Sequence, residues 1–351
     1  YTSGMRVFLT IDSKLQTASN TAMKKGLLNY DKRHGYRTAV EKVPEDQLQD
    51  TATLINKLRQ IKTATENHAA VVLEINKDKA SLLLKNGSIV TLTLEQAAWA
   101  TPYITVDRVG KKPTSLLEII NVGDIIEVQA ETIISPPPQY QASETQQESD
   151  QQEQNDTNTQ KTRWTLTQTP NVQGALISIA PQSGAIKALV GGYDFNASHY
   201  NRVTQAKRQP GSNFKPFIYL AALENGTTAS TLINDAPIVF EDSNLEAAWR
   251  PENSSGKFYG PTRIRKALYQ SRNLVSIRLL KETGVRTALK TVQKFGFDRN
   301  ALPKDLSLAL GSAALTPMSI ASGYSMLANG GYKISPYLIS LIEDNNGKII
   351  Y

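Results

Sequence analysis

The sequence contains no cysteine and only three histidines, His34, His68 and His199. Without cysteine the chain can form no disulfide framework, no thiolate nucleophile and no cysteine-based metal cage. The histidines are too far apart in the chain to make an HxxxH-type zinc site. We therefore expect no metal and no cofactor, and any nucleophile must be a serine, a threonine, a lysine or a carboxylate.

Long hydrophobic runs are missing as well. No stretch approaches the roughly 18 apolar residues that a bilayer-spanning segment needs, and nothing at the start has the pattern of a secretory signal. Since the chain begins at Tyr1 and not at methionine, we interpret it as a fragment whose targeting or anchoring segment would lie upstream.

What the sequence does contain is enough for two or three domains, because 40% of its 351 residues are hydrophobic. Its 39 basic and 32 acidic side chains give a net charge of +7. This excess favours an anionic partner, such as nucleic acid, a membrane surface or a cell-wall polymer.

The first half of the chain changes its hydrophobic period near residue 69. Before this point the pattern predicts a strand at 6–11, a helix that Asp12 begins and that ends near Gly26, and a second helix at about 45–63. After it, turn residues separate five short strands, which predict a small all-β barrel or sandwich. Their sequences are VVLEI, ASLLL, SIVTLTL, ITVDRV and DIIEVQAE.

Residues 136–161 interrupt every pattern with three prolines and a Gln/Glu/Ser-rich tract, which predicts a disordered insertion. Regular structure then resumes, with strands first and helices later. The predicted strands are 164–168, 174–179 and 185–190, the predicted helices are 212–225, 262–283, 284–296 and 316–329, and the predicted terminal hairpin is 337–351.

Ser212-Asn213-Phe214-Lys215 is the tetrapeptide that suggests chemistry. At the start of a helix, residues three apart share a face, so the Ser212 hydroxyl and the Lys215 amine can meet. Burial would lower the pKa of the amine and make it a base, which is the Ser-Lys alternative to a Ser-His pair. The basic residues Lys207 and Arg208, just upstream, would either lower this pKa further or form a solvated turn.

Two other patterns are relevant to the hypothesis that Ser212 and Lys215 form a catalytic pair. Ser254-x-x-Lys257 repeats the spacing within a stretch rich in Pro, Asn, Ser and Gly, where we expect a loop and no alignment of the two side chains. Ser271-Arg272-Asn273 is the only SxN triplet in the chain. It would supply a second hydroxyl to relay a proton and an amide to hold a substrate amide, or it would be a polar patch between helices.

The order of the two motifs, and long stretches around them, closely resemble the class A penicillin-binding proteins of the 1a type. The resemblance covers nearly the whole chain except the Gln-rich tract. Among the matching stretches are TIDSKLQTA, YDKRHGYR, GALISIAPQSGAIKALVGGYDF, NRVTQAKRQPGSNFKPFIY, LINDAPIVFEDSNLEAAWRPENSSGKFYGPTRIRKAL and SLALGSAALTPMSIASGYSMLANGG.

This resemblance implies a multi-domain α+β protein with a transpeptidase fold like that of the serine β-lactamases and an OB-like domain. It implies three domains. Residues 1–68 would be a linker together with the N-terminal part of the transpeptidase region. Residues 69–165 would form the OB-like domain, and residues 166–351 would form the transpeptidase domain.

The implied activity is D,D-transpeptidation of peptidoglycan stem peptides, with inhibition by β-lactam antibiotics. By the same resemblance Ser212 is the nucleophile, Lys215 the base of acylation, Ser271 a proton relay, Asn273 a substrate-binding amide and Trp249 a residue near the cleft mouth. Trp249 is equally well interpreted as a buried anchor under its loop.

The implied location is the periplasmic face of the inner membrane, with the anchor outside this chain. The OB-like domain would bind a regulatory lipoprotein or a partner from the cell-division or elongation machinery.

The chain departs from the family pattern in two ways. It has no Lys-Thr/Ser-Gly motif, which we expect beyond Tyr351, and it has no acidic glycosyltransferase motifs, so it should polymerise no glycan. An alternative is therefore a catalytically incomplete scaffold that binds partners.

Two further alternatives are weaker. An OB-fold nucleic-acid binder would need exposed aromatics among basic residues, but residues 69–131 offer only Trp99 and Tyr103, so we expect no nucleic acid. A Ser-His-Asp site would require His199, near Asp194, to reach Ser212 without a Gly-x-Ser-x-Gly elbow.

Overall fold

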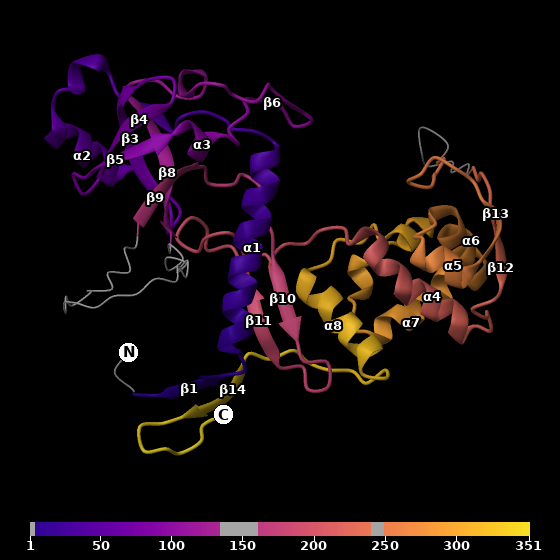
Figure 1. Cartoon of the computed structure of the whole chain (residues 1–351). Helices are drawn as coiled ribbons and strands as arrows, with labels where there is room; N and C mark the ends of the chain where they lie inside the picture. The colour runs from indigo at the N-terminus through magenta and orange to yellow at the C-terminus, as the bar shows by residue number, and fades with distance from the viewer. Residues whose placement is uncertain (1–3, 134–160, 240–248) are drawn as a thin grey trace, which may run out of the picture. The chain divides into compact units, whose positions relative to one another are not determined.

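The computed structural model describes residues 4–133, 161–239 and 249–351 (Figure 1). Contacts between residues divide the chain into two compact units. We call Tyr1–Met23, Gly174–Gly192 and Tyr200–Tyr351 the helical unit, and Lys24–Gln173 with Tyr193–His199 the sheet unit. The tract that the sequence predicts to be disordered, 136–161, lies outside the described residues apart from Lys161, which begins a strand.

An antiparallel sheet in the order β2-β8-β3-β4-β5, with β9 paired to the other part of β8, organises the sheet unit. Its strands are β2 (Glu41–Lys42), β3 (His68–Ile75), β4 (Lys79–Leu84), β5 (Ile89–Thr93), β8 (Asp124–Ile133) and β9 (Lys161–Thr167). The unit also contains α2 (Thr51–Gln60), α3 (Leu94–Ala97) and a hairpin of β6 (Tyr103–Thr105) and β7 (Arg108–Val109).

Both faces of this sheet are covered, which explains its continuous apolar strands. In β3, Ala70 and Val72 belong to one hydrophobic core, and Ala69 and Val71 belong to the other, because side chains alternate between the two faces of a strand. The second core includes Leu54 and Leu58 of α2. A strand buried on both sides has no polar alternation in its sequence.

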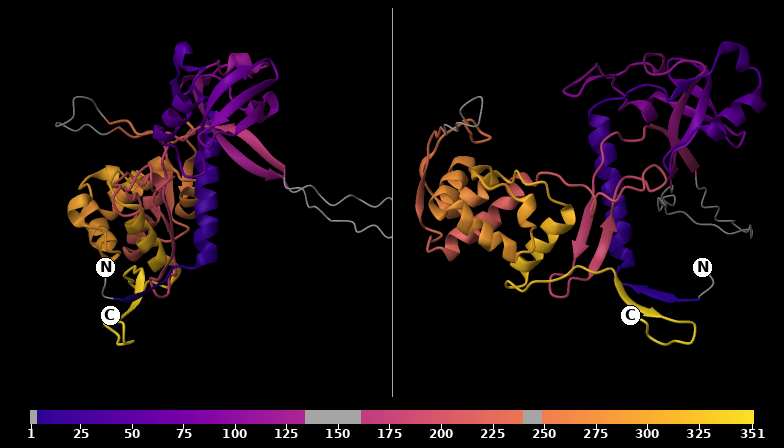
Figure 2. Two further views of the ribbon diagram at one scale, coloured as in Figure 1. Left: turned by 90° about the vertical axis from the view of Figure 1, so that its left-hand side faces the viewer. Right: turned by 180° about the vertical axis from the view of Figure 1, so that it is seen from behind.

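The helical unit contains three two-stranded pairs and a cluster of helices. The strands are β1 (Arg6–Leu9) with β14 (Ile339–Glu343), β10 (Leu176–Ile179) with β11 (Ile186–Val190), and β12 (Leu232–Asp235) with β13 (Gly260–Arg263). The helices are α4 (Lys215–Glu224), α5 (Ile264–Tyr269), α6 (Asn273–Thr283), α7 (Val285–Lys294) and α8 (Pro317–Ala328). They gather into one body (Figure 2). Helices α4, α6, α7 and α8 contribute to a hydrophobic core rich in phenylalanine, which we call the aromatic core, and α5 contributes to a second core.

A further helix, α1 (Ser13–Arg33), begins beside β11. The side-chain amide of Gln16 donates to Leu189 O at 3.0 Å and accepts from Leu189 N at 2.9 Å. The Gln16 amide therefore pairs with the edge of β11 as a neighbouring strand would, and it satisfies backbone groups that would otherwise lack partners.

The first predicted helix continues seven residues past Gly26, to Arg33. A glycine inside a helix costs only about 1 kcal/mol, and tertiary contacts offset this cost. Leu27 is buried, and the Asp31 carboxylate accepts from Arg37 Nη1 at 2.7 Å and from Gln168 Nε2 at 2.8 Å.

The second predicted helix begins later than expected because Asp50 caps it. The Asp50 side chain accepts from Ala52 N at 3.0 Å and from Thr53 N at 3.2 Å, so the α-helix starts at Thr51. The sequence before it forms only a short 3₁₀ turn, Glu45–Gln47. The strand predicted at 104–109 is also wrong in detail, because it divides into β6 and β7.

The rings of Phe214, Phe217, Phe295 and Phe297 pack against one another at the centre of the helical unit. We expect Phe217→Ala to lower the free energy of unfolding of this unit by about 3–5 kcal/mol, because it leaves a cavity among the rings. Chemical denaturation measures this loss. Leu223→Ala, on the same helix but 42% exposed, is the control and should cost about 0.5 kcal/mol or less. Equal losses in the two variants would contradict this account of the core.

Candidate active site

Ser212 lies in a 3₁₀ turn, Gly211–Phe214, that leads directly into α4. In a 3₁₀ turn, side chains three residues apart lie one above the other, which puts Ser212 and Lys215 on the same side of the turn. Their surroundings differ. Ser212 is exposed, whereas Lys215 is only 1% exposed. The turn therefore presents a hydroxyl to solvent above a buried amine.

Segments distant in sequence hold this turn in place. Gly211 N donates to Gly311 O at 3.2 Å, and the Tyr324 hydroxyl donates to Asn213 O at 2.9 Å. Gly311 ends a 3₁₀ turn in the left-handed conformation, with φ 70°, and a Cβ there would lie 2.0 Å from Gly211 O. Only glycine fits this contact.

The Lys215 amine joins the two motifs that the sequence singles out. Its Nζ donates to Ser271 O at 2.7 Å, to Ser271 Oγ at 3.0 Å and to Asn273 Oδ1 at 2.7 Å. Among the described residues, no hydrogen bond joins Nζ to Ser212 Oγ. The three protons of the ammonium form are thus all accepted by the Ser271-x-Asn273 segment.

Burial lowers the pKa of Lys215 from 10.5 to about 8. Desolvation penalises the charged amine, and neither a neighbouring cation nor a carboxylate contributes to the shift. The sequence suggested that Lys207 and Arg208 either lower the pKa of Lys215 or form a solvated turn. The structure gives no support to the first interpretation. Both residues are exposed, and Arg208 instead pairs through its backbone with Leu315.

Ser271 interrupts the helix that the sequence predicts at 262–283. Its φ is 55°, and it is the only residue other than glycine with a positive φ among those that the structure describes. The chain leaves α5 at Tyr269, turns at Ser271 and starts α6 at Asn273. This break directs the Ser271 carbonyl and hydroxyl and the Asn273 amide to the same nitrogen, which a continuous helix would not do.

Sequence reasoning missed Asn253, which holds the start of α6. Its buried Oδ1 accepts from Asn273 N at 2.9 Å and from Leu274 N at 3.5 Å. Its Nδ2 donates to the buried Asp235 at 2.8 Å and to Lys257 O at 2.9 Å.

The residue before Asn253 also contacts this segment, because Asn273 Nδ2 donates to the backbone O of Glu252 at 2.9 Å. Nothing in the loop's composition distinguishes Asn253, because its role depends on contacts 18–21 residues away.

The other candidates lie elsewhere. Trp249 is half-buried and packs against the aromatic core, and both interpretations of this residue stay predictions. Ser254 and Lys257 lie in a loop, as predicted. Asp194 accepts from Thr65 N and Thr65 Oγ1.

Among the residues that the structure describes, no group of three or more histidine, aspartate or glutamate side chains could hold a metal ion. No helix in the described part of the chain is long and apolar enough to cross a bilayer.

The chain matches the models of two known protein families. The penicillin-binding protein transpeptidase domain matches residues 174–350, and the penicillin-binding protein OB-like domain matches residues 36–172. The predicted α+β class, a transpeptidase fold with an OB-like domain, is confirmed. The domain limits expected from the sequence, at 69 and 166, stay predictions.

Individual relatives agree with these models. The chain is 41% identical over 351 residues to Penicillin-binding protein 1A of Pseudomonas aeruginosa and 38% identical over 354 residues to that of Escherichia coli. Both alignments cover 100% of this chain but only 39% and 38% of the relatives, so the chain spans about two fifths of their length. The crystal structure of Penicillin-binding protein 1A from Haemophilus influenzae matches with a TM-score of 0.80 at 33% identity, over 100% of this chain and 46% of that chain.

We expect Asn253→Ala to destabilise the helical unit by about 1–3 kcal/mol, because the buried Asp235 and the N–H groups at the start of α6 lose their partner. The free energy of unfolding measures this effect. Ser255→Ala, at an exposed position in the same loop, should change it by about 0.5 kcal/mol or less. If both variants are as stable as the parent protein, Asn253 does not hold the Ser271-x-Asn273 segment.

Proposed function

The chain belongs to the penicillin-binding protein transpeptidase family, and from this premise we propose that it forms an acyl-enzyme at Ser212 during D,D-transpeptidation of peptidoglycan stem peptides. In this proposal Lys215 is the base, Ser271 relays the proton and Asn273 binds the substrate amide. One observation supports these roles best, namely the buried Lys215 amine within 3.0 Å of Ser271 Oγ and 2.7 Å of Asn273 Oδ1.

The lowered pKa gives the amine a neutral fraction near neutral pH. With a pKa of about 8, roughly a tenth to a quarter of Lys215 is unprotonated between pH 7 and 7.5. An unperturbed lysine would be unprotonated in less than about one molecule in a thousand. The neutral amine keeps two N–H groups and gains one lone pair, which is free to take a proton.

Acylation then proceeds by proton transfer and attack. The neutral Nζ accepts the Ser212 hydroxyl proton as Oγ bonds to the carbonyl carbon of the penultimate D-alanine. The amide C–N bond breaks, and Ser271 donates its hydroxyl proton to the departing D-alanine nitrogen while Nζ returns a proton to Ser271. The products are an ester at Ser212 and free D-alanine.

In deacylation the same residues act in the opposite direction, and the amine of a neighbouring stem takes the place of the departing D-alanine. An amine of a neighbouring stem attacks the Ser212 ester, loses a proton through Ser271 to Nζ, and forms the cross-link as Ser212 regains its hydroxyl proton. Water in place of the amine would give carboxypeptidase products. A β-lactam resembles the D-Ala-D-Ala end of the stem, and opening of its ring by Ser212 would leave a slowly hydrolysed ester.

The same premise carries the proposals on location and partners. We place the protein at the periplasmic face of the inner membrane, where its peptidoglycan substrates are found. The OB-like part of the chain would bind a regulatory lipoprotein or another partner in wall synthesis.

Ser212→Ala should abolish the covalent adduct with a fluorescent penicillin, because the only proposed nucleophile is then missing. Intact-protein mass spectrometry of the full-length protein detects the adduct. Ser254→Ala is the matched control, since it removes the serine of the second SxxK pattern, and it should leave the adduct intact. An adduct that survives Ser212→Ala would refute the assignment.

The rate of penicillin acylation should rise with pH and level off above about pH 8, because only unprotonated Lys215 accepts the serine proton. Lys215→Met should lower this rate at least about a hundredfold. Stopped-flow fluorescence between pH 6 and 9.5 measures both effects, with the exposed Lys290→Met as control. A rate that is flat or falling over this range would show that the amine is not the base.

A further inference from the structure

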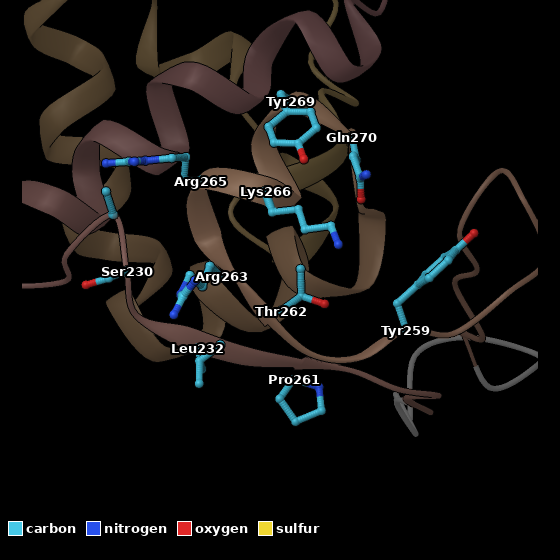
Figure 3. Close-up of a pocket in the computed structure, with 11 residues that line it drawn as sticks. Ser230, Leu232, Tyr259, Pro261, Thr262, Arg263, Arg265, Lys266, Tyr269 and Gln270 are labelled. Carbon is cyan, nitrogen blue, oxygen red and sulfur yellow. The ribbon is translucent and has the colours of Figure 1, made fainter.

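A cavity of about 620 Å³ opens on the helical unit between the β12–β13 ribbon and α5 (Figure 3). It is distinct from the Lys215 surroundings, because none of the residues that bind Nζ lines it. The lining residues are Ala229, Ser230, Leu232, Tyr259, Pro261, Thr262, Arg263, Arg265, Lys266, Tyr269 and Gln270.

The local sequence makes this cavity basic. Helix α5 buries Ile264 and Ala267 against the core and exposes Arg265, Lys266 and Tyr269. The ribbon adds Arg263, which is also exposed. Among the residues that the structure describes, no lining residue carries a carboxylate and none of the three cations forms a salt bridge. Together they create a positive potential that attracts anions.

The cavity wall contacts the middle residue of the Ser271-x-Asn273 segment. The Arg272 guanidinium lies 3.4 Å from the centre of the Tyr259 ring, and its Nη2 donates to Gln270 Oε1 at 3.0 Å. The two residues on either side of Arg272 instead contact Lys215. One short segment therefore holds the amine through its outer residues and the cavity wall through its central residue.

We propose that this cavity binds the carboxylate-bearing end of the acceptor stem peptide, an inference that rests on the proposed transpeptidation. That reaction needs two stems, and the donor occupies the Ser212 side. An acceptor stem brings carboxylates, which the planar fork of an arginine binds through two hydrogen bonds.

The neutral lining residues suit the rest of such a peptide. Tyr259 and Tyr269 offer ring faces, with Tyr269 71% exposed, and Ser230 and Gln270 are groups that can hydrogen-bond to peptide amides. Leu232 and Pro261 add an apolar edge on the ribbon. A surface with cations, aromatic faces and amide-binding groups fits a short anionic peptide better than a bare ion.

Equilibrium binding to the Ser212→Ala form of the full-length protein tests the cavity without turnover. The probes are two fluorescent stem peptides with the same sequence, one ending in a carboxylate and the other in an amide. The variant is Arg263→Gln with Lys266→Gln, and the matched control is Arg286→Gln with Lys290→Gln, which changes two exposed cations on α7.

We expect the carboxylate peptide to bind about tenfold more tightly than the amide peptide, with a preference that weakens as salt is added. The cavity variant should lose this preference and the control should keep it. In the protein with Ser212 intact, the same cavity variant should lower the ratio of cross-linking to penicillin acylation.

Two results would overturn the inference, namely equal binding of the two peptides, or a preference that the cavity variant retains. Failure of the proposed function gives a different result. If penicillin forms no adduct at Ser212 while the carboxylate preference is lost in the cavity variant, then the cavity still binds the anionic end of the peptide, but its role as an acceptor site falls with the transpeptidase mechanism.

Discussion

The amine of Lys215 lies out of solvent against three oxygen acceptors, and the chemistry that we propose for the site depends on this placement. A pKa lowered from 10.5 to about 8 means that the protonated amine is disfavoured by roughly 3 kcal/mol relative to water. The acceptors do not remove this penalty, because none of them is a carboxylate. A neighbouring carboxylate would have stabilised the charge and made the amine a poor base.

Much of the surrounding structure serves to keep these groups fixed. The 3₁₀ turn of Ser212 rests on Gly311 and on the Tyr324 hydroxyl, which come from segments about a hundred residues later. The start of α6 rests on Asn253, which in turn contacts the buried Asp235. The left-handed conformation of Ser271 is unfavourable for a residue other than glycine. The hydrogen bonds that Ser271 accepts from Lys215, and those that Asn253 makes at the start of α6, stabilise this conformation. Positioning of this kind requires a rigid body, which the aromatic core of the helical unit provides.

Several elements could be predicted from the sequence because local signals determine them. Short apolar runs separated by turn residues predicted most strands of the sheet unit, and the apolar periodicity predicted α4, α7 and α8. The placement of Ser212 and Lys215 on the same side of one turn also follows from spacing alone, although no hydrogen bond joins their side chains in the part of the chain that the structure describes. The contacts of Lys215 with Ser271 and Asn273 do not, since 56 and 58 residues separate the partners. The family resemblance implied a proton relay at Ser271 and a substrate-binding amide at Asn273, and the structure adds the contacts of both residues with Lys215.

Two of the errors have a common cause, because tertiary contacts overrode local propensity. Helix α1 continues past Gly26 because Leu27 is buried and the Asp31 carboxylate accepts hydrogen bonds from Arg37 and Gln168. The helix predicted at 262–283 broke at Ser271, although no glycine or proline lies there, because Asn253 caps a new helix at Asn273. The role of Asn253 and the basic cavity could not be predicted from the sequence, since each depends on residues that only folding brings together.

A direct titration of the Lys215 amine tests the central claim most simply. Nitrogen-15 NMR of lysine-labelled protein, with the resonance assigned by its loss in Lys215→Met, reports the protonation of Nζ as pH is raised. We expect a midpoint near pH 8, because burial lowers the pKa of the amine. A midpoint near 10.5, the value of a solvated lysine, would contradict it.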